Sequence, residues 1–180
     1  TKVNELNNLK PNFKLLTHNL ENQKLSIRDI IIDDNKIYIS IDKRREKDCS
    51  NNQIFVATIH FEKKLEFKNL FKSLECVSNL EGGKMQMWEK DNEKSILLST
   101  SADGLKNDDE SDLKPQSDES IYGKILLIDI KDGSHTVFSK GHRNTLGLYA
   151  SIEENIILNT ENGPKGGDEI NSILFGKNYG

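Results

Sequence analysis

The chain has 180 residues, of which 34% are hydrophobic and 30% charged, with a formal net charge of −4. This length suits one domain with a buried core, and the apolar share is too large for a disordered chain. The acidic balance and the scattered Lys and Arg argue against a nucleic-acid surface, and no apolar run approaches the roughly 20 residues of a membrane helix. The chain opens without Met or a signal-like segment, so we expect a processed or truncated piece.

Short β-type segments separated by turns follow one another from residue 37 onward. None keeps a helical stripe for three turns. Residues 65–74 fit either a helix or an extended segment, and the flanking strands favour the extended one. Residues 1–36 yield no firm assignment. The predicted strands are 37–41, 53–60, 95–100, 124–130, 155–160 and a short final one at 173–175.

Residues 101–120 differ in composition from the segments on either side. They hold seven acidic residues and Pro115 and almost no apolar side chain, which predicts a long surface loop between two strands. Such long loops usually serve a site or are disordered. Many short strands with intervening turns predict an all-β sandwich, barrel or propeller.

The chain has two cysteines, Cys49 and Cys76. They form no CxxC pair and no His stands at zinc-ligand spacing, which argues against a metal site. Either they bridge neighbouring strands in an oxidising compartment or they are reduced, buried thiols. Their spacing leaves both alternatives open.

The most informative stretch is GHRNTLGLYASIEENIILNTENGPKGGDEIN, residues 141–171. Arg143 presents a planar fork of donors that suits carboxylates and quinone oxygens. Asn144 offers both a donor and an acceptor. Taken alone, this pair is also typical of an exposed turn. His142 has the chemistry of a general base, but a packed, hydrogen-bonded side chain is the alternative.

Two further pairs follow in the same stretch. Gly163 and Pro164 form a tight turn that exposes main-chain carbonyl oxygens, and calcium accepts such oxygens. Asp168 and Glu169 have three alternatives: they ligate calcium directly or through water, they hold the loop by accepting backbone N–H bonds, or they form a solvated acidic turn.

The segments GKILLIDI, SKGHRNTLGL, NTENGPKGGDEIN and GKNYG together closely resemble the glucose/sorbosone dehydrogenase family. The match is dense over residues 123–180 and looser over 37–120, where the turn at 81–84 still fits. The resemblance implies an all-β, six-bladed β-propeller that is soluble and periplasmic or extracellular. It also implies oxidation of aldose sugars, as small-molecule substrates, with pyrroloquinoline quinone (PQQ) and calcium as cofactors.

The resemblance also implies roles for particular residues. Arg143 and Asn144 would contact the quinone. The carbonyls of Gly163 and Pro164 would bind the calcium. Asp168 and Glu169 complete the predicted metal site on the strength of their own chemistry. By the same resemblance His142 is a packed residue and not the catalytic base, and the disulfide between the two cysteines becomes the favoured alternative.

One position departs from the family pattern. The family's catalytic base is a histidine two residues before a Gly-Gly-Arg turn; here the turn is Gly-Gly-Lys at 82–84 and the position holds Leu80. Leucine cannot accept a proton, and a general base contributes about 10²–10⁴-fold to the rate. The acid that orients the base matches Asp103, which is otherwise a plain turn residue. Nothing in the sequence brings His60 or His135 to the vacant position.

Length is the second departure. At about 40–50 residues per blade, the chain is expected to hold an incomplete set of about four blades, as a partial propeller domain over residues 1–180. The leading hypothesis is a sugar dehydrogenase whose activity the leucine puts in question. The alternative is a catalytically degenerate propeller that acts as a ligand-binding or structural module. A third hypothesis is a carbohydrate- or protein-binding propeller without cofactor, and the oligomeric state is left open.

Overall fold

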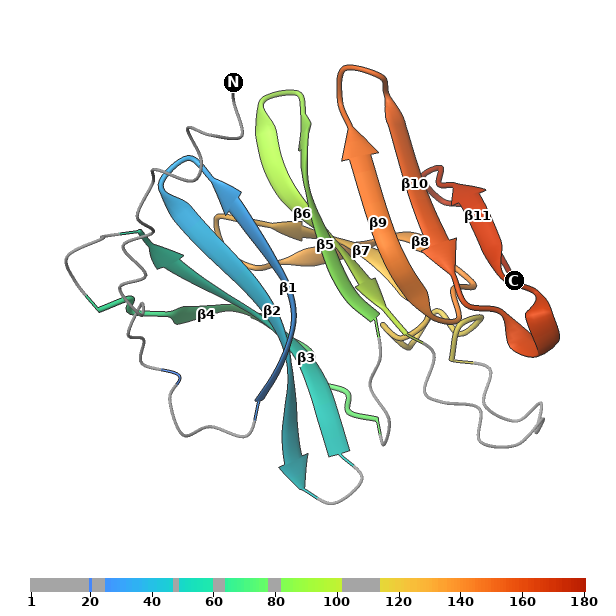
Figure 1. The fold of residues 1–180 in the computed structure, drawn as a ribbon, viewed down its shortest axis with the longest axis horizontal. Helices are drawn as coiled ribbons and strands as arrows, with labels where there is room; N and C mark the ends of the chain where they lie inside the picture. The colour runs from blue at the N-terminus through green and yellow to red at the C-terminus, as the bar shows by residue number, and fades with distance from the viewer. Residues whose placement is uncertain (1–19, 21–24, 47–48, 60–63, 78–81, 102–113) are drawn as a thin grey trace, which may run out of the picture.

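The structure, a computed structural model, describes residues 20, 25–46, 49–59, 64–77, 82–101 and 114–180. Within these ranges the strands form three antiparallel sheets, which Figure 1 shows side by side from blue to red. Strands that follow one another along the chain pair with one another, as in a meander. The first sheet is β1 (Leu25–Asp33), β2 (Lys36–Glu46), β3 (Cys49–Thr58) and β4 (Lys68–Lys72).

The second sheet lies between the other two, and the third has one strand fewer (Figure 1). The second sheet is β5 (Gly82–Lys90), β6 (Glu93–Thr100), β7 (Lys124–Asp129) and β8 (His135–Lys140), and the third is β9 (Thr145–Ser151), β10 (Ile156–Glu161) and β11 (Glu169–Ser172). The first strands of successive sheets, β1, β5 and β9, contact one another in order. This arrangement is that of consecutive propeller blades around an axis.

Apolar side chains fill the space between neighbouring sheets. One buried cluster joins Tyr38, Ile54 and Phe71 of the first sheet to side chains of β5, β6 and β7. Another joins Leu97, Ile125 and Phe138 of the second sheet to Ile157 and Ile173. The second sheet is therefore buried on both faces, which explains why β6 and β7 read as almost continuous apolar runs.

The long connection between β6 and β7 is confirmed, since β6 ends at Thr100 and β7 begins at Lys124. Residues 102–113 of this connection lie outside the described part. The fully buried Lys124 anchors the described remainder by donating from Nζ to the carbonyl oxygens of Lys114 (2.8 Å), Pro115 (3.0 Å) and Tyr122 (3.0 Å). Burial lowers the pKa of Lys124 to about 8.

The described residues form three sheets, and the second, which contains the long β6–β7 connection, extends from Gly82 to Lys140. One sequence expectation is wrong. The final strand is β11, and it ends at Ser172, before the predicted 173–175. Ile173 is apolar because it packs into the core with 2% exposure, and not because it continues a strand.

Other expectations are confirmed. Residues 65–74 are extended and contain β4, with no helix. Cys49 and Cys76 form a disulfide. It ties the start of β3 to the segment that leads to β5, beside the paired backbone of Ser50 and Val77. No helix in the described residues is long and apolar enough to cross a membrane.

Candidate functional site

The pairing of β9 with β10 brings two distant parts of the sequence together. Arg143 and Asn144 directly precede β9, and the turn that starts at Asn162 directly follows β10. The strands are antiparallel and Thr145 pairs with Glu161, so the start of one strand meets the end of the other. The backbone N–H of Asn162 donates to the carbonyl of Asn144 at 3.0 Å, which closes this end of the sheet.

The Arg143 side chain lies along the beginning of that turn. Its Nη1 donates to the main-chain oxygen of Asn162 at 2.8 Å and to the side-chain Oδ1 of the same residue at 3.2 Å. Nε and Nη2 have no hydrogen-bond partner among the described residues, so the outer edge of the guanidinium keeps its donors for another group. The structure thus places this cation next to the residue that precedes Gly163.

A buried pair beneath the surface fixes the backbone of Arg143. His142 is fully buried; its Nδ1 hydrogen-bonds to Glu161 and its Nε2 to the Ser139 hydroxyl at 2.8 Å. The second carboxylate oxygen of Glu161 accepts from the backbone N–H of Arg143 at 2.9 Å. The imidazole also stacks on the Tyr179 ring, with the centroids 5.2 Å apart. The expected packed, hydrogen-bonded histidine is confirmed.

The Glu161 carboxyl keeps its charge in this environment. Burial alone would raise its pKa, but the hydrogen bond and charge of His142, with the Arg143 N–H and the Asn159 amide, lower the pKa below its usual value. A carboxylate that accepts several hydrogen bonds in this way is held in one orientation. The pair therefore positions the start of β9, and the buried histidine has no path to a ligand at the surface.

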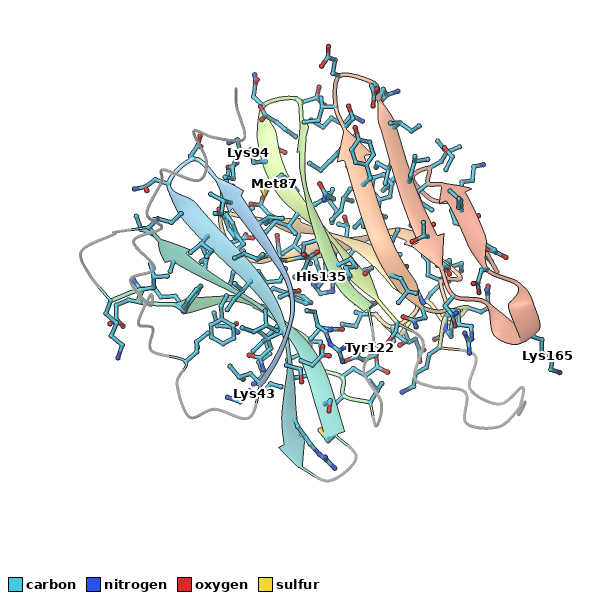
Figure 2. All side chains as sticks on the ribbon, viewed as in Figure 1. Lys43, Met87, Lys94, Tyr122, His135 and Lys165 are labelled. Carbon is cyan, nitrogen blue, oxygen red and sulfur yellow. A yellow bond between two sulfur atoms is a disulfide. The ribbon has the colours of Figure 1, made fainter. Side chains whose placement is uncertain are left out.

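The turn after β10 is tight and depends on glycine. A Cβ on Gly163 would lie 1.8 Å from the carbonyl oxygen of Gly167, so no larger residue fits there. Lys165 has a positive φ of 55° within the single 3₁₀ turn Pro164–Gly166, and Figure 2 shows its side chain at the tip, pointing away from the sheet. The Oδ1 of Asp168 accepts from the Gly163 N–H at 3.1 Å and from the Asn162 amide at 3.3 Å.

These bonds bear on the two acidic residues predicted to lie near a metal. Asp168 holds the turn by accepting the Gly163 N–H, as one of the three alternatives expects. Glu169 is exposed at the start of β11 and accepts from the Asn171 amide at 3.0 Å. In the described part of the chain no three acidic, His or Cys side chains cluster as metal ligands. A role of the acids in metal binding stays a prediction.

A cavity of about 360 Å³ opens where the first strands of the three sheets meet. Ile27 and Arg28 of β1, Gly82 and Lys84 of β5, and Asn144, Thr145 and Leu146 at the start of β9 line it. Asn144 Oδ1 is buried and has no hydrogen-bond partner within the described ranges. A buried polar atom without a partner is costly, so this oxygen indicates a missing donor.

Two basic side chains face this cavity. The Arg28 guanidinium pairs with the buried carboxylate of Asp42. Lys84 Nζ donates to the main-chain oxygen of Arg28 at 3.3 Å, and no carboxylate among the described residues forms an ion pair with it. The close approach of β1 to β5 needs Gly83, since a Cβ there would lie 2.8 Å from Cβ of Arg28.

The position predicted for the catalytic base lies next to this cavity in the sequence. Leu80 and its partner Asp103 both lie outside the described residues, as does His60. The two ends of the short segment around Leu80 are nevertheless fixed: the disulfide and the pairing of Val77 with Ser50 hold one end, and the Ser40 hydroxyl donates to the Gly83 carbonyl at the other.

Sequence reasoning missed three residues of this site: Arg28, Lys84 and Glu161. Arg28 lies in a strand that the apolar pattern did not reveal. In the sequence, Lys84 served only to match the Gly-Gly-Lys turn with the family's Gly-Gly-Arg turn. A cation that directly follows two glycines could have indicated a binding residue. Glu161 ends β10 directly before the turn, and only the three-dimensional pairing shows that it meets His142.

Comparison with known proteins agrees with this geometry. The model of the family described as Glucose / Sorbosone dehydrogenase matches residues 26–180. A curated relative, the "Uncharacterized protein slr1608" of Synechocystis sp. (strain ATCC 27184 / PCC 6803 / Kazusa), is 50% identical over 44 residues, which are 24% of this chain and 11% of that protein.

Solved structures show the same fold. A crystal structure of a glucose dehydrogenase superposes with a TM-score of 0.72 at 21% identity, over 86% of this chain and 49% of that one. The soluble aldose sugar dehydrogenase (Asd) of Escherichia coli, in the apo-form, has a TM-score of 0.68 at 19% identity, over 88% and 49%. A putative oxidoreductase (glucose dehydrogenase) of Thermus thermophilus has a TM-score of 0.64 at 21% identity, over 87% and 49%.

At these sequence identities the structural similarity establishes the fold alone. The chain spans about half the length of each of these solved relatives. The family match, in contrast, extends over most of the chain and includes every described residue that forms the turn, the buried pair and the cavity. The sheets are consecutive blades of a β-propeller, and the chain belongs to the glucose/sorbosone dehydrogenase family.

Proposed function

We propose that the intact protein oxidises aldose sugars with PQQ as electron acceptor and calcium as its companion ion. The observation that carries this proposal is the meeting of Arg143, Asn144 and the Asn162–Gly163 turn at one end of the third sheet. Family membership supports the reaction class, and sugar dehydrogenases are prominent among the similar structures.

The residues fit the quinone chemically. PQQ carries carboxylates and quinone oxygens, which need donors, and the Arg143 guanidinium has donors to spare beyond its bonds to Asn162. The Asn144 amide can donate to such an oxygen from its nitrogen, and its Oδ1, which has no partner among the described residues, is left for a donor from the substrate. When bound, the quinone supplies the oxidising power, since it accepts the hydride of the sugar's anomeric carbon.

Calcium has a more limited fit. Its ligands would be the main-chain oxygens of Gly163 and Pro164, because calcium accepts carbonyl oxygens and the turn is rigid. Asp168 would hold that turn, and Glu169 would add negative charge near the ion. In the described residues no cluster of three candidate ligand side chains lies at this turn, so the proposed calcium site rests on the two main-chain oxygens.

Binding of the quinone tests the proposal before turnover does. The intact protein, titrated with PQQ at saturating calcium, should bind it, and Arg143→Met should weaken binding about tenfold or more because charge-assisted hydrogen bonds are lost. Arg44→Met removes an exposed arginine of β2 and should leave binding unchanged. Absence of both PQQ binding and dye reduction with an aldose would reject the proposal.

A second function is favoured by Leu80. A leucine at the base position cannot remove the sugar's hydroxyl proton, so the protein could bind quinone and sugar without oxidising it at a useful rate. Leu80→His distinguishes the two. A gain of activity in the variant, with unchanged PQQ affinity, would indicate a pocket that lacks only its base. No gain would favour a ligand-binding or structural module.

The disulfide supports a location. Disulfides persist in oxidising compartments, so Cys49–Cys76 is consistent with a periplasmic or extracellular protein. Mass spectrometry of protein alkylated in intact cells checks this: the two thiols should be protected from alkylation unless a reductant is added first. Free thiols in the native protein would contradict the assignment.

A further inference from the structure

We infer that the cavity between β1, β5 and β9 binds a sugar that carries a carboxylate, such as a uronic acid, with Lys84 as the residue that recognises the charge. This inference rests on the proposed function, because it names the substrate class of the same site. Its starting point is the charge of the cavity wall.

The lining of the cavity is cationic. Arg28 and Lys84 face it, and none of the described residues that line it is acidic. The Asp42 carboxylate forms an ion pair with Arg28 and so offsets its charge. Lys84 Nζ meets a main-chain oxygen at 3.3 Å, a long contact that uses one of its three donors. The net positive charge on this wall therefore belongs to Lys84, and an anion is the complementary ligand.

The Asn144 amide adds a second requirement. Its buried Oδ1 has no hydrogen-bond partner among the described residues. Because an amide oxygen can only accept, the ligand must supply a donor such as a hydroxyl. A simple inorganic anion or an aromatic carboxylate offers the acceptor that Lys84 needs but no hydroxyl for this oxygen. An acidic sugar offers both, since its hydroxyls donate and its carboxylate accepts.

Size and wall chemistry agree with a monosaccharide. The volume of about 360 Å³ is at the lower end of the range for small-ligand pockets. Ile27 and Leu146, which are 63% and 57% exposed, contribute apolar surface on two sides. Such surface suits the C–H face of a sugar ring. The proposed function uses the nitrogen of the Asn144 amide for the quinone, and this inference uses the oxygen, so the two roles are compatible.

A matched ligand pair tests the inference in the intact protein. Glucuronate and its neutral analogue glucuronamide differ in charge and hardly in shape, and calorimetry measures their affinities without turnover. Glucuronate should bind at least about tenfold tighter, and Lys84→Met should abolish that difference because the charge-assisted bond is gone. Lys84→Arg keeps the cation and should retain the preference. Lys72→Met, on the exposed edge strand β4, should also retain it.

Three outcomes overturn the inference: equal binding of the two ligands, a preference that survives Lys84→Met, or a preference lost in Lys72→Met. Titration of the same proteins with PQQ alone separates this test from that of the proposed function. PQQ binding without a preference for glucuronate would reject the inference and leave the dehydrogenase proposal standing. A Lys84-dependent preference without PQQ binding or dye reduction would support the acidic-sugar site and reject the dehydrogenase proposal.

Discussion

The first and third sheets both bring a buried carboxylate to the candidate site, but the pKa of the two carboxyl groups is shifted in opposite directions. In the third sheet Glu161 bonds His142, the Arg143 N–H and Asn159, and its pKa is lowered despite its burial. In the first sheet burial raises the pKa of Asp42 to about 6, although Arg28 and Asn52 donate to it. The acid that accepts more hydrogen bonds has its pKa lowered, and the acid with fewer donors has its pKa raised by burial.

The two sheets also fix their loops differently. The third sheet uses non-covalent contacts, among them hydrogen bonds that run from the buried histidine through Glu161 to the backbone of Arg143 and on to the turn. The first sheet adds a covalent bond, Cys49–Cys76, just before the segment that contains Leu80. The comparison predicts that the third sheet is most sensitive to loss of a side chain and the first to redox state, and that the two sheets respond oppositely to pH.

The largest effect is expected from the pair in the third sheet. His142→Ala leaves a charged, buried Glu161 without its main partner and should lower the free energy of unfolding by about 3–5 kcal/mol. Urea unfolding at neutral pH measures this loss. His135→Ala, which removes an exposed imidazole on β8 that lies edge-on to Phe71, is the control and should cost less than about 1 kcal/mol. Similar losses for both variants would contradict the importance given to the pair.

The disulfide is expected to have the next largest effect. It closes a loop over a sequence separation of 27 residues, which corresponds to about 3.5 kcal/mol of stability. The double variant Cys49→Ser, Cys76→Ser should lose that amount in thermal unfolding. A reducing agent should destabilise the native protein similarly and leave the variant unaffected. Destabilisation of the variant by the reductant would show that the effect does not come from this bond.

Asp42 and Glu161 predict opposite dependences of stability on pH. For Asp42, the folded state keeps the proton that the unfolded chain releases above 3.8, so the free energy of unfolding falls as pH rises from about 4 to about 6 and is flat above. For Glu161, whose pKa is lowered, stability is present above the usual value of 4.5 and is lost as pH falls below it.

Single variants separate these two contributions. Asp42→Asn should remove the decline between pH 4 and 6, which is on the order of 2 kcal/mol. Glu161→Gln should weaken the loss at lower pH. Urea unfolding at a series of pH values measures both. Parallel curves for Asp42→Asn and the native protein would show that Asp42 does not hold its proton in the folded state.

The same contrast explains what the sequence could predict. Strands β6, β7 and β10 were found because neighbouring sheets bury them, and their residues are apolar for that reason. β1 was missed because Ile27, Ile30 and Ile32 are exposed while Arg28 and Asp29 are less so, which is the reverse of the usual pattern. β5 was missed because it opens with Gly82 and Gly83, which read as a turn.

For the site, the sequence indicated Arg143, Asn144 and the Gly-Pro turn but not what joins them. The bond from Arg143 Nη1 to the Asn162 carbonyl depends on the register of β9 and β10, and neither strand encodes that register alone. Lys84 and Arg28 are 56 residues apart and face one cavity only because two blades are adjacent. Such contacts depend on topology, which local patterns do not contain.

The smallest expected effect concerns Asp168, and it separates two roles in the turn. If Asp168 holds the turn through the Gly163 N–H, Asp168→Asn retains an acceptor oxygen and should change both stability and calcium affinity little, whereas Asp168→Ala should cost about 1 kcal/mol. If Asp168 instead ligates calcium directly, the loss of charge in Asp168→Asn should by itself weaken calcium binding about tenfold or more. Calcium titration of both variants in the presence of PQQ decides between the two roles. A strong effect of the Asn variant would show that the carboxylate binds the ion, and Oδ2 can do so while Oδ1 keeps its bond to the Gly163 N–H.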